Sequence, residues 1–143
     1  MAKPDLTVSH EIARTHPSFV TWQTQLARIA AFPKVAVKMS GVFSELDPTA
    51  RQWTPDDAAT QVLPWVAAVF ELFGPERVMW ASDWPVCNVG YAGDDRARQK
   101  DAWNCWRTAS ATILRDLVAK GTITEAQAAD VWGNVARRVY RLA

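Results

Sequence analysis

The sequence predicts an α/β protein in which about two parallel strands are combined with four helices. Two short apolar runs rich in strand-forming residues lie at residues 35–40 and 78–83, and a longer amphipathic stretch separates them. This order of strand, helix and strand is that of a βαβ unit, in which the strands pair in parallel through a right-handed crossover. Amphipathic stretches before and after the unit supply the remaining helices.

The composition is that of one folded domain, residues 1–143, because 49% of the residues are apolar. The 16 basic and 15 acidic side chains give a net charge of +1, and neither sign forms a long block. Nucleic acid and anionic membranes are therefore not expected as partners.

Several features of the sequence bear on the cellular compartment. No apolar run approaches the ~20 residues that span a bilayer, and the opening residues contain no apolar core of signal-peptide length. Cys87 and Cys105 form no CxxC pair, so we expect incidental thiols in a reducing compartment rather than a disulfide or a zinc site. The predicted location is the cytoplasm.

The first helix is expected to begin near Thr15 or Ser18, either of which can cap it, and to end before Pro33. The strand at residues 35–40 follows, and Gly41 permits the turn after it. The apolar stripe of the helix consists of Phe19, Trp22, Leu26, Ile29 and Ala30.

The second helix is expected to start at Thr54 and Pro55 and to stop at Gly74. The second strand follows directly, ends at Asp83, and is stopped by Pro85. The buried stripe of the second helix consists of Val62, Trp65, Val66, Val69, Phe70 and Phe73.

Residues 88–95 form a turn-rich loop of the kind that lines a pocket above a strand end. A long helix is expected from near Asp95 to Ala119, and a last helix from Thr124 to a basic final turn at residues 137–141. Two parallel strands do not make a complete sheet, because parallel sheets are normally covered on both faces and extended at both edges. Further strands are therefore expected beyond these two.

Four stretches of the sequence resemble the amidohydrolase-related family of (β/α)8-barrel hydrolases, and within it the sugar-lactonase branch. The longest and most specific stretch runs from Phe73 to Val86, and the others are residues 3–5, 37–41 and 132–136, in the family's order. The resemblance implies the C-terminal portion of a TIM-barrel, metal-dependent hydrolase. The two strands would then be the seventh and eighth of the barrel.

By the same resemblance, Asp83 occupies the position of the family's catalytic aspartate. A complete barrel needs roughly 250 residues, and the family's His-x-His pair has no match in this sequence. We therefore expect Met1 to be an internal methionine of a longer coding sequence or the start of a truncated product. We also expect the chain alone to lack full activity.

Hydrolysis of a lactone needs an activated water, a polarised carbonyl and a proton for the leaving alkoxide. A carboxylate at Asp83 suits the first task, because it can take the proton of a water directly or beside a divalent metal ion such as zinc. The resemblance makes Asp83 a candidate ligand of that metal. The alternative is that Asp83 is a turn or N-cap residue ahead of Pro85.

Strand alternation places Asp83, Ala81 and Met79 on the face toward the barrel interior. Ser82, Trp80 and Val78 then face the helices. We therefore expect Trp80 to be a core residue.

Three further residues are candidates for substrate binding. Trp84 lies past the strand end, where its indole would wall a sugar ring or simply pack. Lys38 interrupts an apolar strand, and it would contact a substrate oxygen or balance a carboxylate if it points inward, but is otherwise an ordinary edge residue. Ser40 shares that face and is the weaker candidate.

The two histidines, His10 and His16, have no second pair of metal-ligating residues at a matching spacing. Helix capping or surface exposure is the expected role for both. The sequence therefore offers no zinc site of its own.

Three functional hypotheses remain open at this point. The first is a lactone hydrolase with a small-molecule lactone as substrate, the second a non-catalytic fragment or assembly partner, and the third an unrelated small α/β module. Exposed strand edges and half-covered tryptophans predict self-association.

Overall fold

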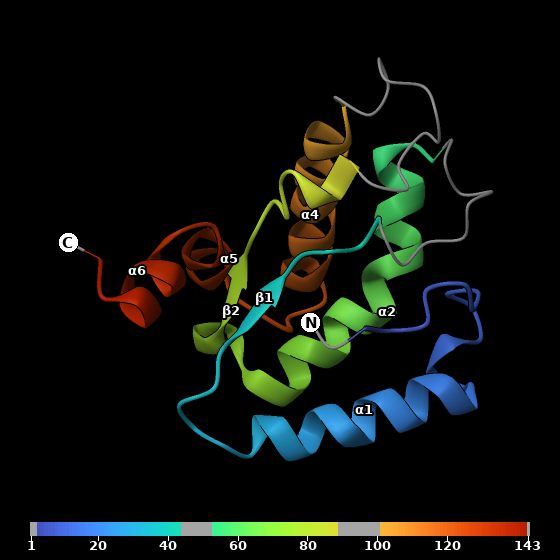
Figure 1. Cartoon of the computed structure of the whole chain (residues 1–143), viewed down its shortest axis with the longest axis horizontal. Helices are drawn as coiled ribbons and strands as arrows, with labels where there is room; N and C mark the ends of the chain where they lie inside the picture. The colour runs from blue at the N-terminus through green and yellow to red at the C-terminus, as the bar shows by residue number, and fades with distance from the viewer. Residues whose placement is uncertain (1–2, 44–52, 89–100, 143) are drawn as a thin grey trace.

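The computed structural model describes residues 3–43, 53–88 and 101–142. At its centre lies a two-stranded parallel sheet of β1 (Val37–Met39) and β2 (Val78–Trp80), with Val37 opposite Val78 and Met39 opposite Trp80. Figure 1 places α2 on one side of the sheet and α5 and α6 on the other, with α1 along the base. The βαβ unit and the parallel pairing are therefore as predicted.

Helix α1 (Pro17–Ala30) is capped by His16, whose Nδ1 accepts a hydrogen bond from the Ser18 backbone N–H at 3.3 Å. The prediction of Thr15 or Ser18 as the cap is wrong, because these residues lie one position before and two positions after His16. Pro17 explains the actual start, since proline suits the first helical position. Ile29, expected in the buried stripe, is 43% exposed.

Helix α2 (Pro55–Phe73) begins and ends as its sequence predicts. Thr54 accepts from the Asp57 backbone N–H while the Asp57 carboxylate accepts from the Thr54 backbone N–H, which is a capping box. These hydrogen bonds to Thr54 lower the pKa of Asp57. Gly74 ends the helix at φ 71°, a conformation that glycine adopts without steric cost.

The second strand is shorter than predicted. β2 ends at Trp80, and the last ladder bond runs from the Ala81 N–H to the Met39 carbonyl at 3.2 Å. Asp83 has φ 60°, which is incompatible with an extended strand. The strand therefore does not reach Asp83, although the chain continues in its direction as far as Ala81.

The C-terminal part contains one helix more than predicted, so the described residues hold five α-helices. Helix α4 (Ala102–Ala119) is followed by α5 (Glu125–Val131) and α6 (Asn134–Tyr140). The last two were predicted as a single helix, but Gly133 has φ −164° and ψ −43°, which breaks the helical path. The expected start of α4 near Asp95 and the loop at residues 88–95 lie largely outside the described residues.

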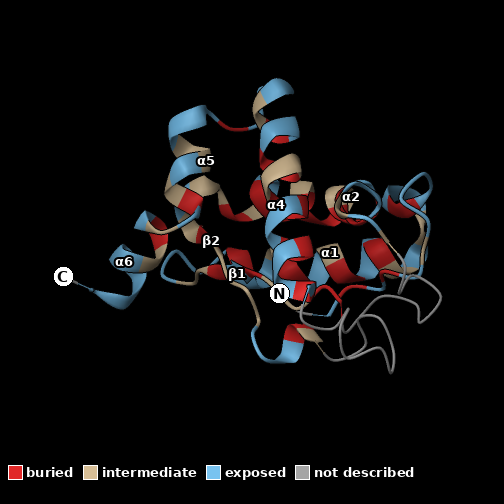
Figure 2. Ribbon diagram, turned by 90° about the horizontal axis from the view of Figure 1, so that it is seen from above, coloured by how far each residue is buried: buried red, intermediate tan, exposed pale blue. Residues whose placement is uncertain are grey.

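The core lies between the sheet and helices α1, α2 and α4, whose buried faces turn toward one another (Figure 2). Trp65 of α2 and Trp106 of α4 are its largest fully buried side chains. Burying a large apolar side chain contributes about 2–3 kcal/mol relative to leaving it in water. Trp80 is partly buried, and its ring packs on that of Trp132 at 5.2 Å between centroids, so it faces the helices as predicted.

Arg77 joins three segments at the end of the sheet where β1 and β2 begin. Its guanidinium donates to the carbonyls of Ala30 at 3.0 Å and Phe32 at 3.1 Å, which follow the last turn of α1. It also donates to the carbonyl of Val35 at 3.3 Å, before β1, and to that of Phe73 at 2.8 Å, at the end of α2. One side chain thus satisfies backbone acceptors at the ends of both helices and at the entry to the sheet.

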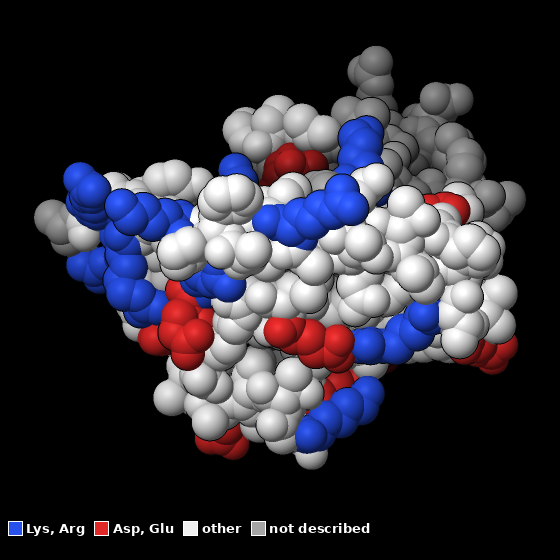
Figure 3. Space-filling model, turned by 90° about the horizontal axis from the view of Figure 1, so that it is seen from below, with Lys and Arg blue, Asp and Glu red and all other residues white. Residues whose placement is uncertain are grey.

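No helix among the described residues is both long and apolar enough to cross a membrane. Lys and Arg side chains gather at the left end of the face seen from below, the end at which α6 lies, while both signs mix over the rest of that face (Figure 3). The last turn of α6 contains the exposed Arg137 and Arg138.

Candidate active site

Asp83 lies at the carboxyl ends of both strands. A Cβ atom placed on Gly41, two residues after β1, would lie 3.6 Å from Asp83 Oδ2, so the carboxylate sits directly over the backbone that leaves β1. The residue is half-buried. In parallel α/β proteins this edge of the sheet is where catalytic groups and ligands collect.

The backbone around Asp83 forms a tight turn. The Asp83 carbonyl accepts from the Cys87 N–H at 2.8 Å, and the Trp84 N–H donates to Ser82 Oγ at 3.2 Å. Asp83 has a positive φ of 60°, which is uncommon for a residue other than glycine and is found preferentially at functional sites.

The carboxylate of Asp83 accepts no hydrogen bond from any described residue. An N-cap role would require a backbone N–H two or three residues later to donate to it. The 3-10 turn at Val86–Asn88 is instead closed through the Asp83 carbonyl. The carboxylate is therefore available at the rim rather than used as a cap within the described structure.

Lys38 and Ser40 lie on one face of β1 and its continuation, as alternation predicts. Lys38 is exposed, whereas Val37 and Met39 on either side of it are buried. The register places Lys38 opposite Met79, and Ser40 follows β1 as a half-buried residue closer to the rim. The prediction that alternation puts Asp83 on the same face is wrong, because β2 ends at Trp80 and Asp83 has φ 60°. Asp83 instead approaches this segment at Gly41.

Trp84 follows Asp83 directly and is 69% exposed, so it does not pack in the core. Its peptide bond to Pro85 is cis. The exposed indole lies at the surface beyond the end of β2. The wall for a sugar ring stays a prediction.

Cys87 is a neighbour of Asp83 that the sequence analysis did not single out. Burial raises the pKa of its thiol, and the nearby negative charge of Asp83 raises it further. The sequence signal for this neighbour is its spacing, since Cys87 lies four residues after Asp83 and its N–H closes the turn on the Asp83 carbonyl. Cys87 and Cys105 are both buried and are not joined by a disulfide.

The described residues do not by themselves make a zinc site. A catalytic zinc ion takes three protein ligands from His, Cys, Asp and Glu, and no such group of three is present in residues 3–43, 53–88 and 101–142. His16 caps α1, and His10 is exposed, in line with their expected roles. Asp83 could supply one ligand at most.

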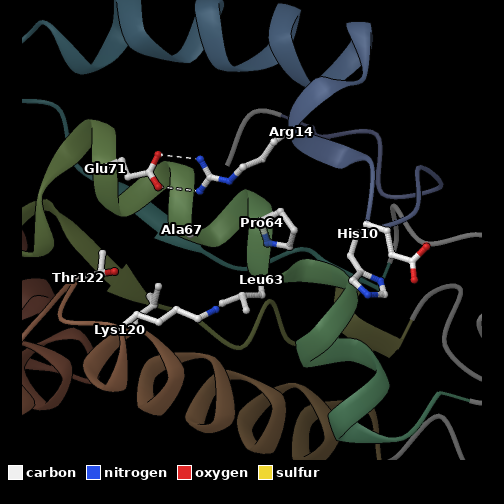
Figure 4. A pocket seen from close by; sticks show the side chains of 10 residues that line it. His10, Arg14, Leu63, Pro64, Ala67, Glu71, Lys120 and Thr122 are labelled. Carbon is white, nitrogen blue, oxygen red and sulfur yellow. Dashed lines mark hydrogen bonds and ion pairs between the residues drawn. The ribbon is translucent and has the colours of Figure 1, made fainter.

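A hollow of about 300 Å³ lies away from Asp83, between α2 and the residues before α1 and after α4 (Figure 4). Arg14 and Glu71 form one wall through two hydrogen bonds of 2.6 and 3.1 Å, and Lys120 and Thr122 at the end of α4 form another. None of the predicted site residues lines it. The hollow lies at the C-terminal end of α4. Trp106, which donates to the Ala81 carbonyl just before the Asp83 turn, lies nearer the other end of that helix.

Comparison with known proteins covers almost the whole chain. Residues 3–142 match the family model described as Amidohydrolase. The chain is 28% identical over 132 residues to an L-fucono-1,5-lactonase of Burkholderia multivorans, which covers 92% of this chain and 39% of that protein. It is 33% identical over 90 residues to an L-rhamnono-gamma-lactonase of Scheffersomyces stipitis, which covers 62% of this chain and 26% of that protein.

Two crystal structures of an amidohydrolase from Burkholderia multivorans are similar in fold, one with bound HEPES and one with bound Zn. Their TM-scores are 0.68 and 0.67 at 26% and 25% sequence identity. The similarity covers 99% and 98% of this chain but 42% and 41% of that chain. The chain thus spans well under half the length of the relatives it matches.

Proposed function

The chain belongs to the amidohydrolase family, and from that premise we propose that it supplies the water-activating carboxylate, Asp83, for hydrolysis of a lactone such as a sugar lactone. We further propose that β1 and β2 are the seventh and eighth strands of a (β/α)8 barrel. The observation that carries the proposal is the position of Asp83, at the carboxyl ends of both strands with no capping partner among the described residues. The similarity to two kinds of sugar lactonase supports the substrate class.

In the proposed reaction the Asp83 carboxylate takes a proton from water, and the hydroxide forms a bond to the lactone carbonyl carbon. The tetrahedral intermediate then breaks the ring C–O bond, and the ring oxygen takes back the proton that Asp83 holds. The product is an open hydroxy acid. Atoms balance with one water added and no other reagent consumed.

The remaining rim residues are proposed to bind the substrate. Trp84 offers an exposed indole face on which a sugar ring can stack. Lys38 and Ser40 lie on the inner face, where an ammonium and a hydroxyl can donate to substrate oxygens. Groups that polarise the carbonyl are not evident among the described residues.

A divalent metal is part of the family hypothesis, and the solved relative with bound Zn is in keeping with it. The described residues do not fit such an ion by themselves, because Asp83 stands without two further ligands among them. We therefore assign no step to a metal. If one is used, its other ligands come from outside the described part of this chain.

The proposal is tested by measuring acid release from L-fucono-1,5-lactone and an open-chain ester, with and without added zinc, against a buffer blank. We expect the lactone to be the preferred substrate, at a low rate because the chain alone is expected to lack full activity, and Asp83→Asn to abolish the turnover. Absence of lactone turnover above the buffer blank in the wild-type chain would count against the proposal as well. Asp116→Asn, which removes an exposed carboxylate on α4, is the matched control. Lactone turnover that persists unchanged in Asp83→Asn would contradict the proposal.

A second candidate is a non-catalytic assembly partner, and exposed aromatic side chains favour it. Trp103 and Trp132 are 38% and 37% exposed, and Tyr140 is 55% exposed. We propose that the chain self-associates through these side chains and the edges of its short sheet. Light scattering that finds a monomer at all concentrations, together with lactone turnover, would favour the enzyme over this candidate.

A further inference from the structure

Two indole hydrogen bonds join β2 to α4, and they run in opposite directions. Trp80 of β2 donates its Nε1–H to Ser110 Oγ of α4 at 3.0 Å. Trp106 of α4 donates its Nε1–H to the Ala81 carbonyl, just beyond β2, at 3.1 Å. Trp106 is 1% exposed and Ser110 is fully buried, whereas Trp80 and Ala81 are half-buried, so both bonds are partly shielded from water.

Trp106 also reaches the exit of the other strand. Its ring meets that of Phe43, four residues beyond the end of β1, edge to face at 6.4 Å between centroids. The same side chain therefore contacts the chain leaving both strands. Asp83 belongs to the segment after β2, and its carboxylate approaches the segment after β1 at Gly41.

The bond to Ala81 fixes the last peptide before the Asp83 turn. The Ala81 N–H is held by the Met39 carbonyl at 3.2 Å, and its own carbonyl is held by Trp106. On the far side, the Cys87 N–H closes the turn on the Asp83 carbonyl. Asp83 therefore adopts its positive φ between two anchored points, one of which depends on an indole N–H.

We propose that Trp106 is a positioning residue for Asp83, which aims the carboxylate at the rim by orienting the peptide after Ala81. Trp106 does not touch the reacting atoms in this account. The inference rests on the proposed role of Asp83 as the base. It goes beyond that role because it names the group that sets the direction of the carboxylate.

A merely structural role for Trp106 predicts a different outcome, and the chain offers a matched control. Trp65 is as deeply buried in the same core, but its Nε1–H has no hydrogen-bond partner among the described residues. Trp106→Phe removes an indole N–H that donates to Ala81, whereas Trp65→Phe removes one for which the described structure shows no acceptor. Ser110→Ala removes the other indole bond and leaves the Trp106 bond in place.

The experiment is NMR of the full chain, with the backbone resonances of residues 81–84 as the readout. We expect Trp106→Phe to shift the Ser82 and Asp83 amides, while Trp65→Phe and Ser110→Ala leave them in place. On a lactone substrate, Trp106→Phe should lower kcat about tenfold with KM unchanged. Ser82 and Asp83 resonances identical in Trp106→Phe and wild type would overturn the inference.

The NMR readouts separate this inference from the proposed function, since they do not depend on turnover. If Asp83→Asn leaves activity unchanged, the base assignment fails while the NMR result still shows whether Trp106 orients Asp83. Should Trp106→Phe fail to fold, the wild-type protein decides. We expect slow solvent exchange of the Trp106 indole proton and a nuclear Overhauser contact from it to the Ser82 amide, and a rapidly exchanging indole proton contradicts the inference.

Discussion

A charged side chain lies at each end of the β1–β2 sheet, and the hydrogen bonding of the two differs. At the end where the strands begin, the Arg77 side chain donates to five separate backbone carbonyls, among them those of Ala30 and Phe73. At the end where they finish, the Asp83 carboxylate accepts nothing from the described residues. The Arg77 guanidinium therefore holds parts of the fold together, whereas the Asp83 carboxylate is the group for which we propose a chemical role.

This difference follows the division of labour of (β/α) architectures, in which stability resides at one end of the strands and catalysis at the other. A charge that is fully hydrogen-bonded holds segments together but is not free to exchange protons. A half-buried carboxylate with a positive φ is a less stable arrangement, of the kind that is kept at functional sites. Substitutions at the two ends should therefore affect different properties.

The largest effect on folding is expected for Arg77→Met. It leaves several partly buried carbonyls without their donor, and we expect a loss of about 2–4 kcal/mol of unfolding free energy. Urea denaturation measures it. Arg14→Met is the control, because the Arg14–Glu71 pair is exposed at 47% and 44% and should contribute less than about 1 kcal/mol. Equal losses in the two variants would remove the special role of Arg77.

A smaller effect, on both stability and lactone turnover, is expected for Gly41→Ala. Gly41 has φ 75°, so alanine should cost about 1 kcal/mol of stability, and its Cβ would stand 3.6 Å from the Asp83 carboxylate. We expect kcat/KM for a lactone to fall about tenfold, which corresponds to about 1.4 kcal/mol.

Gly121→Ala is the matched control for that substitution. Gly121 has φ 71°, and a Cβ on it would meet nothing within 4 Å. It should show the same loss of stability with turnover unchanged. If both glycine variants lose turnover alike, strain rather than the neighbourhood of Asp83 is the cause.

The smallest effect concerns the thiol of Cys87. Burial and the charge of Asp83 both raise its pKa, and Asp83→Asn removes the second cause. The pKa of Cys87 should therefore fall in Asp83→Asn and stay in place in Asp116→Asn, as followed by the pH titration of Cys87 ¹³Cβ. A value unaffected by Asp83→Asn would mean that the two side chains are not neighbours in solution.

Local sequence signals were sufficient for α2, because Thr54 and Pro55 begin it and Gly74 ends it. The early end of β2 was not predicted, because Asp83 has a positive φ and no glycine in the sequence indicates such a backbone conformation there. The break between α5 and α6 did have a signal, Gly133, but the apolar spacing across it favoured one continuous helix.

For the site, the sequence predicted the place of Asp83 because strand ends are visible in apolar runs. It did not predict the surroundings of Asp83, because they depend on how α4 packs. The hydrogen bond from Trp106 to Ala81 joins residues 25 apart, and only the packed structure brings them together. Trp106 is buried, and nothing in the sequence shows where its N–H points.

The central claim is that the Asp83 carboxylate takes the proton from the attacking water. The most direct measurement is the ratio of kcat/KM for L-fucono-1,5-lactone between Asp116→Asn and Asp83→Asn, with both variants shown to be folded. Loss of a general base costs about 10²–10⁴-fold, so the account predicts a ratio of at least about 100. A ratio close to one would contradict it.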